Sequence, residues 1–150
     1  MKKVNVAFIS LLALSLVACM TDKHAMVNNP QKIFSAVSAA HPGEKNTLVY
    51  IGASDGWAAT HHAESAVEDN VNNGKVVAIV SALALKTTTV IVAGEDESLT
   101  AATLTKVLTS DKSKINGSKL VIVGSQESQK TLADLAAASG VTLEFIDNPL

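Results

Sequence analysis

Three apolar runs in the chain end in the same way, and this shared ending constrains the fold more than any other feature. The segments "LVYIGASDG", "TVIVAGEDES" and "LVIVGSQES" each pass from apolar residues to a glycine and then to small or acidic residues. Glycine lets a chain turn sharply off a strand, and Ser or Asp caps the N–H groups that open a following helix. The pattern therefore predicts three strand-to-helix joints of one α/β sheet.

The apolar runs are nearly continuous rather than alternating, which is typical of strands buried on both faces of a parallel sheet. We predict four strands, at residues 47–51, 88–93, 119–123 and 141–146. Residues 98–109 and 126–139 carry apolar side chains at helical spacing, and Gly140 is expected to end the second of these helices.

Further helices are predicted before and after the first strand. Asn29 precedes Pro30 as an N-cap before a proline at the first helical position, and "HPG" at 41–43 should end that helix. Residues 58–71 suit a helix. The segment 75–86, "KVVAIVSALALK", is compatible with a strand or a helix, and its apolar spacing favours a helix.

Alternating strands and helices predict a single three-layer α/β domain over residues 30–150. Its sheet should be mainly parallel, with about four strands and Rossmann-like or flavodoxin-like layering. The three glycine joints must then lie at one rim of the sheet, where ligands bind in open α/β folds. The candidate binding residues on this rim are Ser54, Asp55, Trp57, Glu95, Asp96 and Ser125, with Ser98 and Glu127 beside them.

The first joint also resembles the nucleophile elbow of α/β-hydrolases. Gly52-Ala53-Ser54-Asp55-Gly56 fits G-x-S-x-G between a strand and a helix. The resemblance implies Ser54 as a nucleophile, with His61 or His62 as its base. Two features depart from that family, because no histidine follows His62 and the elbow comes after the first strand instead of after several. The alternative is a tight turn in which Asp or Ser caps the next helix.

No metal or nucleotide cofactor is predicted. The chain contains neither H-E-x-x-H nor C-x-x-C, and the adjacent His61 and His62 diverge by about 100° on a helix. His61 could share a helix face with Glu64, although a solvated face explains this spacing as well. The glycine joints lack both G-x-G-x-x-G and G-K-[ST], and the rim is acidic where a phosphate site needs positive charge.

The composition argues against nucleic acid as a partner. The chain has no arginine, the residue that most often recognises phosphates and carboxylates through two parallel hydrogen bonds. Aromatic residues, which dominate protein interfaces, are scarce. Trp57, beside the first glycine joint, is the one conspicuous candidate anchor for a partner.

The N-terminal segment is typical of a secretory signal. Lys2 and Lys3 precede the apolar run "VAFISLLALSLVA", which is too short for a stable membrane span. The run ends in Leu16-Val17-Ala18-Cys19, which resembles the lipobox of bacterial lipoproteins. This resemblance implies cleavage after residue 18 and a mature chain that starts with a lipidated Cys19, the sole cysteine.

The lipoprotein resemblance also implies a location. Residues 19–29 would form a lipidated tether, so the protein is expected to be anchored to a membrane without spanning it. In lipoprotein sorting, an Asp directly after the Cys favours retention in the inner membrane. Met20 and Thr21 stand there instead. The resemblance thus implies an outer-membrane lipoprotein that faces the periplasm.

These expectations lead to one functional hypothesis and two alternatives. The hypothesis is a lipid-anchored, non-catalytic accessory or assembly factor that binds a protein of a cell-envelope system. The first alternative is a small serine hydrolase that uses Ser54 with His61 or His62. The second is a binder of a small ligand or a cation at the acidic rim of the sheet.

Overall fold

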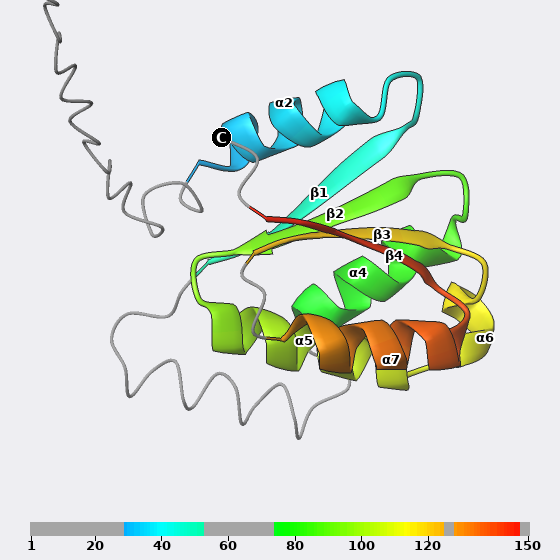
Figure 1. Cartoon of the computed structure of the whole chain (residues 1–150). Coiled ribbons are helices and arrows are strands. Elements are labelled where there is room, and N and C mark those ends of the chain that lie inside the picture. Colours follow the sequence, from blue (N-terminus) through cyan, green and yellow to red (C-terminus); the bar gives the residue numbers. More distant parts are fainter. Residues whose placement is uncertain (1–28, 53–73, 125–127, 148–150) are drawn as a thin grey trace, which may run out of the picture.

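The computed structural model describes residues 29–52, 74–124 and 128–147, and these residues form an α/β domain (Figure 1). Its elements are α2 (Pro30–Ala40), β1 (Asn46–Ile51), α4 (Gly74–Ala84), β2 (Thr89–Gly94), α5 (Glu97–Thr109), α6 (Lys112–Ile115), β3 (Lys119–Val123), α7 (Gln129–Ser139) and β4 (Thr142–Ile146). The four strands make one all-parallel sheet, in which every strand pairs with its neighbours in the order β1-β2-β3-β4. The predicted fold class is confirmed.

The sheet lies between two unequal helical layers. Figure 1 shows α4, α5 and α7 together on one face of the sheet and α2 on the other. Parallel neighbouring strands joined by right-handed crossovers place all their helices on the same face, which accounts for the thicker layer. Within the described sheet, the strand order also never reverses. The described strands therefore form no switch-point crevice of the kind that binds ligands in Rossmann folds.

The predicted strand positions agree closely with the structure. The strand at 119–123 matches β3, β1 and β4 differ from the predicted ranges by one residue at one end, and β2 is shifted by one residue at both ends. The segment at 75–86 forms the helix α4, whose buried side chains are Val76, Ile79 and Leu83. The short helix α6 was not predicted. The helix predicted at 58–71 lies outside the described residues.

Each helical layer buries its own set of apolar side chains against the sheet. The larger core joins α4, α5, α6 and α7 to one face of all four strands. On the other face, Ile33 and Val37 of α2 pack on Ile91, Ala93 and Val121, among others. Alternate residues of one strand thus enter different cores, as the two-residue period of a strand requires.

The helix ends follow the predicted capping signals. The Asn29 side chain accepts a hydrogen bond of 3.1 Å from the backbone N–H of Lys32, and Pro30 occupies the first turn of α2. Gly140 ends α7 in the left-handed conformation, with φ of 71°. A residue with a side chain is strained in that conformation, so glycine is the expected residue there.

Gly94, the second glycine joint, is tightly packed where a side chain would project. A Cβ built on it would clash with Thr100 Oγ1 and would lie 3.1 Å from the carbonyl oxygen of Ile51. Thr100 cannot easily yield, because it is buried and its hydroxyl donates a 2.6 Å hydrogen bond to the carbonyl oxygen of Asp96. The joint therefore needs glycine at position 94, because there is no space for a side chain.

We expect Gly94→Ala to lower the free energy of unfolding by about 1–3 kcal/mol, the usual cost of inserting a methyl group into a packed site. Gly52→Ala at the neighbouring joint is the matched control, because a Cβ there meets no atom of the described residues within 4 Å. It should change stability by less than about 0.5 kcal/mol. Urea denaturation of both variants measures the difference, and equal effects would contradict the packing argument.

Candidate functional site

The structure brings the three glycine joints to one end of the sheet, as predicted. Ile51 lies opposite Gly94 in the β1–β2 ladder, and Ala93 lies opposite Val123 in the β2–β3 ladder. Gly52, Gly94 and Gly124 therefore follow neighbouring strand ends at the same rim. Of the predicted rim residues, Glu95, Asp96 and Ser98 belong to the described part of the chain.

Asp96 caps helix α5. Its Oδ1 accepts hydrogen bonds from the backbone N–H of Leu99 at 2.9 Å and from the hydroxyl of Ser98 at 2.8 Å. A carboxylate at this position satisfies an otherwise unpaired N–H and interacts favourably with the positive end of the helix dipole. The sequence motif allowed this capping role as the alternative to ligand binding.

Glu95 and Lys75 lie around the end of β1. The Tyr50 hydroxyl donates to Glu95 Oε1 over 3.4 Å, and Lys75 Nζ donates to the carbonyl oxygen of Tyr50 over 2.8 Å. Partial burial, and then the negative charge of Glu95, raise the pKa of Tyr50 to about 12. The phenol is therefore protonated at neutral pH and serves as a hydrogen-bond donor.

Most of the other predicted site residues lie outside the described residues. They are Cys19, Ser54, Asp55, Trp57, His61, His62, Ser125 and Glu127. The hydrolase alternative depends on three of them, Ser54, His61 and His62, so it stays a prediction. In the described ranges, no three His, Cys, Asp or Glu side chains are grouped so that they could hold a metal ion.

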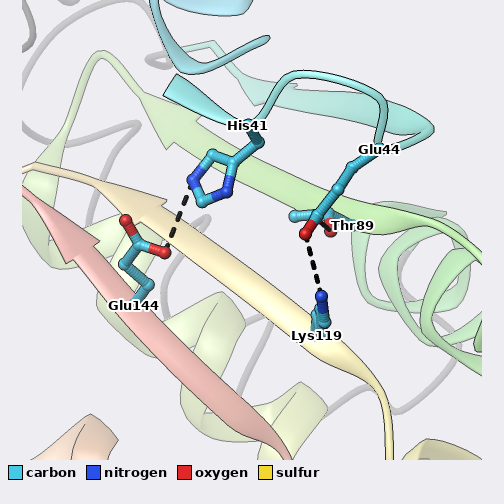
Figure 2. Close-up of polar contacts among 5 residues, drawn as sticks. All are labelled: His41, Glu44, Thr89, Lys119 and Glu144. Carbon is cyan, nitrogen blue, oxygen red and sulfur yellow. Dashed lines mark hydrogen bonds and ion pairs between the residues drawn. The ribbon is translucent and has the colours of Figure 1, made fainter. Parts of the chain in front are cut away.

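A second polar cluster, absent from the sequence predictions, joins the segment after α2 to the sheet (Figure 2). Glu44 Oε1 lies 2.9 Å from Lys119 Nζ, and Glu44 Oε2 accepts a 2.5 Å hydrogen bond from the Thr89 hydroxyl. These two contacts hold the pKa of Glu44 below its usual value, because both favour the charged carboxylate. The cluster fastens the α2–β1 connection across the starts of β2 and β3.

His41, at the C-terminal end of α2, extends this cluster to the last strand. Its Nε2 lies 3.4 Å from Glu144 Oε2 on β4, within ion-pair distance, but without the geometry of a hydrogen bond. Asn46 Oδ1 is also buried without a hydrogen-bond partner among the described residues, although Asn46 Nδ2 donates to Ser38 Oγ over 3.3 Å. A buried polar group without a hydrogen-bond partner costs about 1–3 kcal/mol of stability, so these two groups weaken the attachment of α2 at this edge of the sheet.

The sequence offered two signals for this cluster. Glu44, Thr89 and Lys119 stand just before or at the starts of three strands, and the starts of parallel strands share one edge of a sheet. Glu144 is the other signal, since it is a charged residue inside an otherwise apolar strand. It lies opposite Val121, on the face that α2 partly covers.

A groove of about 480 Å³ lies between α2 and β1. Pro30, Gln31, Phe34 and Ser35 of α2 line it together with Leu48 of β1. None of these side chains carries a charge, and Phe34 is 38% exposed. The groove is thus an apolar surface beside the first strand, at the opposite face of the sheet from α4, α5 and α7.

Comparisons with known proteins give no relative for this chain. No protein-family model matches it, and neither the curated proteins nor the solved structures contain a significant match. In the described part of the chain, no helix has the length and apolar character needed to cross a membrane.

We expect Glu95→Gln to lower the pKa of Tyr50 below about 12 while leaving it above 10, because partial burial is the larger cause of the shift. Tyr50 is the only tyrosine, so the ultraviolet absorbance of tyrosinate titrates this group alone. Asp134→Asn, an exposed change on α7, is the control. An unchanged pKa in Glu95→Gln would show that Glu95 does not act on the phenol.

Glu44 should make stability depend on pH. Its pKa is lowered in the folded state from the ordinary value of 4.5, so its stabilising contribution is present above that pH and is lost as the pH falls below it. Glu44→Gln should therefore be less stable than the wild type at pH 7, and this difference should shrink by about pH 3. Urea denaturation at both pH values measures it. A difference that is equal at both would contradict the assignment.

Proposed function

We propose that this protein is a lipid-anchored envelope protein whose α/β domain acts by binding a protein partner, as a non-catalytic accessory or assembly factor. The observation that carries the proposal is the segment Leu16-Val17-Ala18-Cys19, which ends in the only cysteine of the chain. That thiol stands where a lipoprotein needs its acylation site. The proposed location is the periplasmic side of the outer membrane.

The position of the domain along the chain supports this function. The first described helix, α2, begins at Pro30, so the ten residues 20–29 lie between Cys19 and this helix in the sequence. Ten extended residues span about 33 Å. A tether of this length keeps the domain near the membrane surface, and tethering raises its effective concentration toward a partner held in the same membrane.

The chemistry of the described rim also favours binding over catalysis. Asp96 serves as a helix cap, and Glu95 accepts a hydrogen bond from Tyr50. The pKa of Tyr50 is moved to about 12, away from the neutral range in which a general acid or base works best. These groups therefore have structural roles that suit a stable binding surface.

Lipidation can be tested directly in cells. We expect a palmitate analogue to label the protein, and Cys19→Ser to abolish both the labelling and the cleavage of the signal. Cys19→Ser is a clean variant, since the chain offers no second thiol for acylation. Labelling that persists in Cys19→Ser, or a wild type without any label, would contradict the anchoring proposal.

Partner binding has its own test. A photoreactive amino acid at position 57, in place of the single tryptophan, should crosslink one specific envelope protein in intact cells. Reaction of Ser54 with a fluorophosphonate probe would contradict the non-catalytic function, and Ser54→Ala is the control for that labelling. Crosslinks spread over unrelated abundant envelope proteins would count against a specific partner.

A further inference from the structure

The exposed edge of the sheet and the apolar groove lie at the same strand. In the described residues β1 pairs with β2 alone, so β1 forms one edge of the sheet. Leu48 belongs to this edge strand and also lines the groove between α2 and β1. Figure 1 shows α2 and β1 next to each other, with α2 above the strand in this view.

The hydrogen-bond pattern shows which backbone groups of β1 are directed outward. The carbonyl oxygens of Lys45 and Ile51 accept hydrogen bonds of 2.8 and 2.9 Å from the backbone N–H groups of Thr89 and Glu95. In a parallel ladder, alternate residues direct both backbone groups to the same neighbour. The odd-numbered residues of β1 thus pair with β2, and Asn46, Leu48 and Tyr50 direct their backbone groups away from it.

Among the described residues, the outward edge of β1 is occupied at its end and has no strand paired with its middle. Lys75 Nζ binds the carbonyl oxygen of Tyr50 at 2.8 Å and so occupies the last outward acceptor of β1. Leu48 lies earlier in the strand, and among the described residues no second strand pairs with it. An unpaired edge of this kind is a template for another extended chain.

We propose, on the basis of the proposed binding function, that this edge and groove form a docking site for an extended peptide segment of the partner protein. The segment adds as a strand beside β1 and pairs with the backbone N–H and carbonyl groups of Leu48. Strand addition combines main-chain hydrogen bonds with pockets for alternate side chains. One apolar side chain of the added strand enters the groove against Phe34, on the same face as Leu48.

The charges around the groove indicate which residues the bound peptide carries. The groove is lined only by uncharged side chains, so it favours an apolar residue. The exposed Lys45 directly precedes β1, whereas Lys75 at the other end of the strand already binds the carbonyl oxygen of Tyr50. The nearby Glu44 is paired with Lys119. An acidic residue of the peptide at the Lys45 end of β1 therefore complements the site.

The probe for this site is a displayed library of nine-residue peptides, selected against the purified mature lipoprotein in detergent. Selected sequences should share an apolar residue with an acidic residue on the flank that faces Lys45. N-methylation of the peptide at single positions should weaken binding by about tenfold or more at alternate residues and have little effect between them. This alternation distinguishes strand pairing from simple apolar contact.

Two surface variants distinguish peptide binding in the groove from non-specific hydrophobic binding. Phe34→Ser removes the aromatic wall of the groove, and we expect it to weaken peptide binding by about tenfold or more. Val77→Ser on α4 is the matched control, because Val77 is 46% exposed against 38% for Phe34 and lies outside the groove. Circular dichroism checks that both variants remain folded.

Three outcomes would overturn the inference. They are N-methylation effects without alternation, equal losses in Phe34→Ser and Val77→Ser, and self-association of the protein through the groove in the absence of peptide. The last would make a second copy the occupant. None of these contradicts the proposed function, which depends on lipidation at Cys19 and on crosslinking from position 57.

Discussion

Burial of β2 on both faces is the constraint on which the rest of the structure depends. All six residues of this strand are buried, and β1 and β3 pair with its two edges. Val90 and Val92 belong to the core under α4, α5 and α7, whereas Ile91 and Ala93 belong to the core under α2. A strand that is apolar on both sides requires cover on both sides, so the domain needs α2 although that helix joins no pair of strands.

The two layers cover the sheet to different extents, and this inequality produces the features proposed for binding. Several helices pack on one face, but α2 covers the other with Ile33 and Val37 as its buried residues. The ion pair of Glu44 with Lys119 fastens the segment that follows the C-terminal end of α2. Toward its N-terminal end, Phe34 and Leu48 are left partly exposed around the groove. The surface beside the first strand is thus a consequence of incomplete cover.

Much of the fold could be predicted from the sequence because local signals agreed with the tertiary structure. Continuous apolar runs identified the strands, and Asn29, Asp96 and Gly140 marked helix ends. The segment at 75–86 was ambiguous in composition, and the 3.6-residue spacing of its buried side chains resolved it correctly. Alternation of strands and helices then determined the parallel sheet.

What escaped prediction depends on contacts between distant residues. Nothing local in Glu44 indicates that it meets Lys119, 75 residues later, or that His41 meets Glu144. The groove likewise requires knowing how α2 lies across β1. The order of the strands was also inaccessible, because the glycine joints establish only that the strands are parallel. The sequential order, which leaves the described sheet without a switch point, was therefore not predicted.

The sequential strand order also bears on how the domain assembles. Each strand pairs with the one that precedes it in the chain, so the sheet grows from β1 to β4 without waiting for a later segment to insert between earlier ones. Pairing strands that are consecutive in the chain closes shorter loops than pairing distant strands would, which lowers the entropy cost of each step and favours faster folding. A chain that emerges N-terminus first can therefore build its sheet progressively from β1, before the later strands are available.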